Sequence, residues 1–161
     1  MLTSDLYYGD KPAPKVETVM DSKPRQPKKH GTAWVKDLAD MHAKFGVNPV
    51  VREFDKEKLL AFLNFRIKFL QEELTELIES KTADDAVDAL IDLCVVAIGT
   101  LDAFDVDADI SWDRVHAANM AKNVGVKASR PNPLGLPDLI KPEGWQGPTH
   151  TDNVGLFSKI F

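Results

Sequence analysis

Cysteine and long hydrophobic runs are scarce in this sequence, and each shortage excludes a class of protein. Cys94 is the single cysteine among 161 residues, which excludes an intrachain disulfide and a zinc site built on several cysteines. Because it lies in an apolar run, we interpret it as a small core residue. That run, residues 93–98, is far too short to cross a membrane, and the N-terminus shows no signal pattern. We expect a cytoplasmic protein with no membrane partner.

The charge is mild and the composition is that of an ordinary globular domain. A formal net charge of −5 argues against a nucleic-acid partner. With 43% hydrophobic residues the chain can bury a core, and its length suits one domain.

Proline and charge divide the chain into three parts. Residues 1–36 hold four prolines and seven basic against four acidic residues, so the segment carries about +3 and predicts an extended or disordered arm. This basic arm is a solvated leader or a contact for an acidic partner. Residues 37–123 carry the helical patterns. Residues 124–161 hold five prolines and predict an irregular tail that packs on the core through apolar anchors. These anchors are Leu134, Leu136, Leu139, Ile140 and Trp145.

Apolar residues recur at helical spacing in four segments, and no segment predicts a strand. The first predicted helix is Val35–Phe45, which stops at Gly46, and Pro49 is expected to break the chain after it. The second runs from about Asp55 to Ser80 and the third from about Asp84 to Phe104. The fourth begins at Ser111, a suitable N-cap, and ends near Lys122.

Two acidic clusters suggest chemistry. Glu73 and Glu76 are three residues apart, and Asp85, Asp88 and Asp92 also recur at helical spacing, so each set shares a helix face. The third helix is apolar on nearly every side, which predicts burial and an oligomer that covers it. Carboxylates there need a positive partner, and a hard divalent cation fits. The alternative is a solvated face on which Glu72 pairs with Lys68 or Arg66.

The blocks around these clusters resemble a known superfamily. Glu73-x-x-Glu76 followed by Asp85-x-x-Asp88 is similar to the signature of the all-α nucleoside triphosphate pyrophosphohydrolases, the MazG-like superfamily. The runs DMHAKFG, FRIKFLQEELTEL, DALIDLCVVAIGT, VHAANMAK and IKPEGW resemble a phage and bacterial branch related to phosphoribosyl-ATP pyrophosphohydrolase. The resemblance covers about residues 37–148. It implies an all-α bundle of four to five helices that forms a homodimer or homotetramer.

The resemblance also implies the reaction and its residues. Glu73, Glu76, Asp85 and Asp88 would hold Mg²⁺, with Mn²⁺ as a substitute, and Asp92 is an alternative ligand. Glu72 or Glu73 would position and deprotonate a water that attacks the nucleotide in line. The products are a nucleoside monophosphate and pyrophosphate.

Further residues are candidates for holding the nucleotide substrate. Asn119 and Lys122 match a block that contacts phosphates in the family, although the end of a solvated helix is the other interpretation. His42 and Phe45 are candidates for base recognition or simple packing. Arg66 is a candidate for a phosphate contact or for an ion pair with an acidic residue.

Three other functions compete with this hypothesis. A di-iron carboxylate bundle needs two Glu-x-x-His motifs, and the sequence offers only Asp113-x-x-His116. A non-catalytic helical interaction module would explain the arm and the tail but not the carboxylates of the third helix. Within the enzyme class, phosphoribosyl-ATP is an alternative substrate to dUTP, dCTP, dGTP, GTP or a signalling nucleotide.

Overall fold

The structure is a computed structural model that describes residues 31–126, 134 and 138–161. The chain divides into two compact units, and we describe each by itself. One unit contains residues 29–121 and 143–161, and it carries the helices. The other contains residues 1–28 and 122–142. The all-α class predicted from the sequence is confirmed, because the regular structure described is mostly helical.

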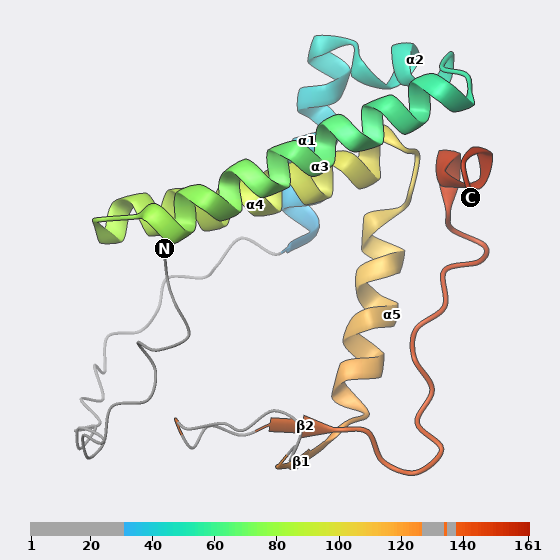
Figure 1. Cartoon of the computed structure of the whole chain (residues 1–161). Helices are drawn as coiled ribbons and strands as arrows, with labels where there is room; N and C mark the ends of the chain where they lie inside the picture. The colour runs from blue at the N-terminus through green and yellow to red at the C-terminus, as the bar shows by residue number, and fades with distance from the viewer. Residues whose placement is uncertain (1–30, 127–133, 135–137) are drawn as a thin grey trace. The chain divides into compact units, whose positions relative to one another are not determined.

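Two long helices, α3 (Lys56–Glu79) and α4 (Ala83–Ala103), form the centre of the helical unit and pack along each other (Figure 1). Both lie within one residue of the predicted helices. The side chain of Asp55 caps α3 by accepting a hydrogen bond from the backbone N–H of Lys58 at 2.9 Å. Thr82 and Asp85 form a capping box at the start of α4. The short turn between the two caps makes the helices antiparallel neighbours.

Helices α1 (Gly31–Phe45) and α2 (Val47–Arg52) precede this pair, and both contact α4. The predicted break at Pro49 is wrong, because Pro49 is the third residue of α2. The N–H groups of a first helical turn have no intrahelical acceptor, so proline is tolerated there. The first helix ends before Gly46, as predicted, and Gly46 adopts a left-handed φ of 68°.

The last α-helix, α5 (Ala108–Met120), begins earlier than predicted. Asp107, not Ser111, is its N-cap and accepts a hydrogen bond from the backbone N–H of Ile110 at 3.0 Å. Residues 143–161 follow α5 and are joined to it by side-chain hydrogen bonds. Arg114 makes a two-pronged ion pair with Asp152, at 2.6 and 2.7 Å, and Asn153 donates to the carbonyl of Asp107 at 2.7 Å.

The C-terminus enters the hydrophobic core. The core cluster consists of Val51, Leu59, Phe104, Val106 and Ile160. The ring of Phe157, from the 3₁₀-helix η2 (Gly155–Lys159), stacks on Phe104 with centroids 4.2 Å apart. Gly155 permits this approach, since a Cβ there would lie 2.1 Å from the Phe104 carbonyl oxygen. Residues more than fifty positions apart thus complete one core.

The other unit contains a small antiparallel sheet of β1 (Asn123–Gly125) and β2 (Asp138–Ile140). It forms where the sequence analysis expected only irregular chain, because three-residue strands are too short to show alternation. Among the tail anchors proposed above, Leu136 lies outside the described residues, and Leu134 and Leu139 are exposed. In the described helices, no stretch has the length and hydropathy needed to span a bilayer.

Candidate functional site

Glu73 on α3 is the centre of a group of carboxylates. It is half-buried, and its Oε2 atom is buried without a hydrogen-bond partner. Burial raises the pKa of Glu73, and the charges of Glu76, Asp92, Glu72 and Asp88 raise it further. The structure therefore brings the two acidic clusters of the sequence close enough to interact across α3 and α4.

This group has the donor chemistry of a site for a hard divalent cation. Carboxylate oxygens are preferred ligands of Mg²⁺, and a buried carboxylate oxygen without a donor is stabilised by a cation. The side chains of this group are not arranged as a complete metal-coordination site, however. Within the described ranges, no three His, Cys, Asp or Glu side chains are placed to hold a metal ion. The residues fit Mg²⁺ by chemistry and by the orphaned oxygen of Glu73.

Asp85 has a local structural role that the sequence analysis did not assign. Its Oδ2 atom accepts hydrogen bonds from the backbone N–H groups of Lys81 and Thr82, both at 3.1 Å, and its own N–H donates to Thr82 Oγ1. The side-chain hydrogen bond with Thr82, followed by the backbone hydrogen bonds from Lys81 and Thr82, lowers the pKa of Asp85. The motif Thr82-x-x-Asp85 is a capping signal in the sequence itself. Its proposed role as a metal ligand stays a prediction.

His42 lies in a buried polar cluster between α1 and α4. The residue is 5% exposed, and Nδ1 donates to Asp102 Oδ2 at 2.6 Å. Asn48 also donates to that oxygen, at 3.1 Å, and to the Asp102 carbonyl. Asp102 and Asn48 were missed from the sequence, because 60 residues separate His42 from Asp102 and no spacing links them. The role of His42 in base recognition stays a prediction.

Arg66 on α3 is hydrogen-bonded to the C-terminal half of α4, near Asp102 in sequence. Its guanidinium donates to Thr100 Oγ1 and to the Val96 carbonyl, both at 2.9 Å. Burial lowers the pKa of Arg66. Gly99 permits the close approach, since a Cβ there would lie 3.3 Å from an Arg66 nitrogen. In the structure Arg66 thus binds protein oxygens of α4, and its phosphate contact stays a prediction.

The other predicted substrate residues lie at helix ends. Phe45 ends α1 with 68% of its surface exposed, and Lys44 lies 5.3 Å above its ring. Asn119 is exposed on the last turn of α5, and Lys122 follows the end of that helix. Lys122 belongs to the other unit, and the structure does not test these three roles.

The central segment of the chain matches a known protein family. Residues 51–119 match a family model described as phosphoribosyl-ATP pyrophosphohydrolase. The match contains the whole carboxylate group and Asn119 but neither His42, Phe45 nor Lys122. It is consistent with the all-α superfamily that the acidic signature predicted. No curated protein matches the chain.

Proposed function

We propose that this chain, whose residues 51–119 form a domain of the phosphoribosyl-ATP pyrophosphohydrolase family, is a cytoplasmic Mg²⁺-dependent nucleoside triphosphate pyrophosphohydrolase. The family match supports a pyrophosphohydrolase-type activity, a hydrolysis of an acid anhydride. The proposal also specifies the bond that is cleaved and the class of substrate. The enzyme hydrolyses the α–β phosphoanhydride of an NTP or dNTP.

One observation carries the metal part of the proposal. Glu73 Oε2 is buried and lacks a hydrogen-bond partner, and the charges of four further carboxylates raise the pKa of Glu73. Burial and neighbouring negative charges disfavour the ionised form of such a group. In the proposal Glu73, Glu76, Asp88 and Asp92 hold Mg²⁺. Asp92 is favoured over Asp85 because the cap already engages Asp85 Oδ2.

The remaining steps belong to the chain's own side chains. Bound Mg²⁺ would offset the triphosphate charge and lower the pKa of a coordinated water. Glu72 is exposed beside Glu73, where its carboxylate can orient a water and accept its proton. The water oxygen forms a bond to a phosphorus of the α–β anhydride, and the bond to the bridging oxygen breaks. The products are a nucleoside monophosphate and pyrophosphate.

Phosphoribosyl-ATP is the second candidate substrate, favoured by the description of the matched family. It carries the same α–β anhydride, so the carboxylate chemistry would serve both. A panel of NTPs, dNTPs and phosphoribosyl-ATP, assayed for pyrophosphate with Mg²⁺ or Mn²⁺, separates the two. Absence of pyrophosphate from every substrate would favour a non-catalytic helical module.

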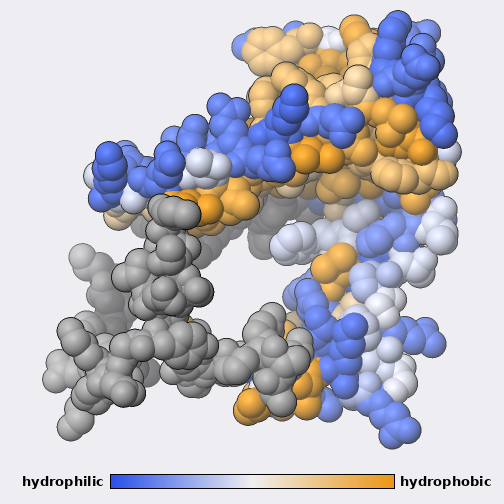
Figure 2. Space-filling model, viewed as in Figure 1, coloured by the Kyte–Doolittle hydropathy of each residue, from blue (hydrophilic) through white to orange (hydrophobic). Residues whose placement is uncertain are grey.

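The proposal includes a homodimer or homotetramer, because apolar residues of α3 and α4 lie exposed on the single chain. Val87 is 61% exposed, Leu90 50%, Leu74 48% and Ile78 54%. Figure 2 shows hydrophobic surface over the helical unit. Exposed apolar surface of this kind is characteristic of protein interfaces.

Isosteric variants test the residue roles. Glu73→Gln and Asp88→Asn should lower kcat by about 100-fold or more, since each removes a charge proposed to hold the ion. Asp84→Asn is the matched control, an exposed α4 carboxylate that takes no part in the proposed site. Lys122→Ala should raise KM with a smaller effect on kcat if it holds the triphosphate. A folded Asp88→Asn protein with normal turnover would contradict the proposal.

A further inference from the structure

Arg66 and Glu73 lie on one face of α3, the face that packs on α4. They are seven residues apart, which is almost two helical turns, or about 10.5 Å along the axis. The residues of this face are buried or half-buried, whereas most others of α3 are exposed. Its apolar members are Leu59, Phe62, Leu63, Leu70 and Leu77. The guanidinium and the carboxylate thus occupy equivalent positions in the contact between two helices.

A stripe of residues on α4 faces them. Its members, at intervals of four, are Asp88, Asp92, Val96 and Thr100. Val96 and Thr100 are buried. Arg66 donates from Nε to the Thr100 hydroxyl and from Nη2 to the Val96 carbonyl, both at 2.9 Å. Arg66 therefore contacts one end of the stripe, and Glu73 interacts with the carboxylates at its other end.

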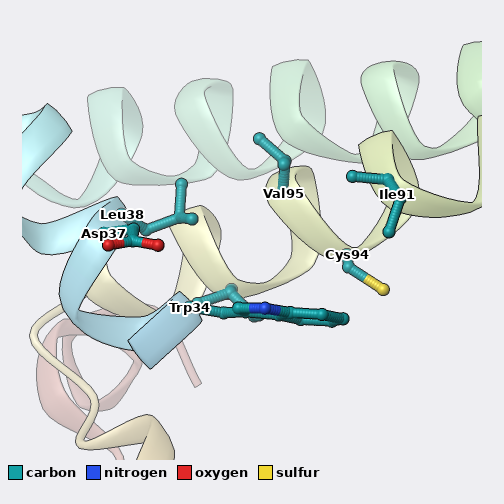
Figure 3. Close-up of a pocket in the computed structure, with 7 residues that line it drawn as sticks. Trp34, Asp37, Leu38, Ile91, Cys94 and Val95 are labelled. Carbon is teal, nitrogen blue, oxygen red and sulfur yellow. The ribbon is translucent and has the colours of Figure 1, made fainter. Parts of the chain in front are cut away.

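Another side of α4 faces α1. Ile91, Cys94 and Val95 line a groove of about 310 Å³ together with Trp34, as Figure 3 shows. These three residues of α4 fall between the members of the stripe in the sequence, so they lie on a different side of the helix. The groove is thus separate from the contact that aligns the carboxylates.

The carboxylates lie between two connections of α3 to α4. At one end a short turn with the capping box joins the helices. At the other end the connection is the pair of hydrogen bonds from Arg66. Between them the charges of Asp92 and Asp88 raise the pKa of Glu73, so like charges push the helices apart when the site holds no cation. Hydrogen bonds that resist this separation keep the carboxylates together.

Arg66 has the chemistry of a residue that fixes the register of two helices. Among the residues that the structure describes, no carboxylate forms an ion pair with it, and both of its acceptors are neutral oxygens of α4. A displacement of α3 along α4 would leave a half-buried guanidinium without these acceptors, which is unfavourable. A single polar residue in a helix contact sets register in this way.

We propose that Arg66 is a positioning residue for the carboxylate group: it fixes the register of α3 on α4 and so sets Glu73 beside Asp88 and Asp92. The inference rests on the proposed function, because it assigns the aligned carboxylates to a divalent cation. Arg66 itself touches neither the cation nor the nucleotide.

Binding of Mn²⁺ without nucleotide distinguishes three roles of Arg66. Loss of a positioning residue weakens binding of the cation. Loss of its positive charge alone would strengthen that binding, because a positive charge repels a cation. Loss of a phosphate contact would leave the binding of Mn²⁺ unchanged and raise KM for the nucleotide.

Arg66→Met and Thr100→Val are the test variants, and the electron paramagnetic resonance signal of free Mn²⁺ measures the Kd. In Arg66→Met the Val96 carbonyl keeps the hydrogen bond from Thr100 Oγ1, so no buried carbonyl loses its last partner. The Kd should rise roughly tenfold or more, the range for residues that orient metal ligands. Thr100→Val, which changes no charge, should raise it by a smaller factor. An equal or lower Kd in Arg66→Met would overturn the inference.

Two controls separate register from charge and from stability. Lys68→Met removes an exposed positive charge two residues along α3 and should leave the Kd unchanged or lower. Phe157→Ala removes a contact with Phe104, at the other end of α4 from Asp88, and should leave the Kd unchanged. If Phe157→Ala raised the Kd as much as Arg66→Met, lost stability would explain both results and the inference would fail.

Spin labels separate this inference from the proposed function. In a Cys94→Ala protein, cysteines introduced at the exposed positions Gln71 on α3 and Ala97 on α4 carry the labels. Without metal, Arg66→Met should broaden or shift the distribution of distances between them. If it does so in a protein that binds no Mn²⁺ and releases no pyrophosphate, Arg66 sets the register and the proposed function fails. If the wild-type protein binds Mn²⁺ but Arg66→Met changes neither the distances nor the Kd, the inference fails and the metal site stands.

Discussion

Replacing Phe157 by alanine should destabilise the whole helical unit, although Phe157 lies far outside the matched domain. Its ring stacks on Phe104, which is 0% exposed, with an angle of 6° between the planes. Removing a fully buried phenylalanine costs about 3–5 kcal/mol. Because Phe157 is half-buried, we expect its replacement by alanine to lower the free energy of unfolding by about 2–3 kcal/mol. For a chain of 161 residues this corresponds to a fall in Tm of roughly 4–12 °C.

The assay is urea unfolding followed by circular dichroism, at one protein concentration because association alters apparent stability. The midpoint should fall while the m-value stays constant. Phe161→Ala is the matched control. Phe161 is 88% exposed, so its loss should change stability by less than about 0.5 kcal/mol. Equal stability of Phe157→Ala and the wild type would refute the assignment of the C-terminus to the core.

Three further outcomes follow from the structure. Light scattering should give a multiple of the 17.9 kDa chain mass, and a stable, active monomer would contradict the proposed association. Millimolar Mg²⁺ should raise the Tm of the wild-type protein. Without metal, Glu73→Gln should be more stable than the wild type, because the raised pKa of Glu73 means that its ionised form destabilises the fold. A lower Tm for Glu73→Gln than for the wild type would count against this reasoning. The hydrogen bond from Arg114 lowers the pKa of Asp152 from 3.8 to about 2. The ion pair should therefore stabilise the fold fully above about pH 4 and lose this contribution as the pH falls toward 2. The stabilities of the wild type and Asp152→Asn, followed by acid unfolding, should differ above pH 4 and converge near pH 2.

The helices of the central segment were predictable because their signals are local. Apolar spacing and the caps at Asp55 and Thr82 define α3 and α4 within a few residues. The Glu73-x-x-Glu76 and Asp85-x-x-Asp88 motifs predicted the superfamily, and the family match over residues 51–119 is consistent with it. Asp85 also belongs to a local capping signal, Thr82-x-x-Asp85, that the sequence itself contains.

Contacts between distant segments were not predictable, because no periodicity or short motif records them. The pairing of His42 with Asp102, and of Arg66 with Thr100, depends on how α1 and α3 pack against α4. The entry of Phe157 into the core depends on a glycine at 155 that lets the chain pass against the Phe104 carbonyl. Hydrophobic patterning specifies which face of a helix is buried, whereas only tertiary packing decides which polar group meets which. The sequence alone thus specifies the helices and the acidic signature, and the folded chain decides which carboxylate has a buried oxygen without a partner and which caps a helix.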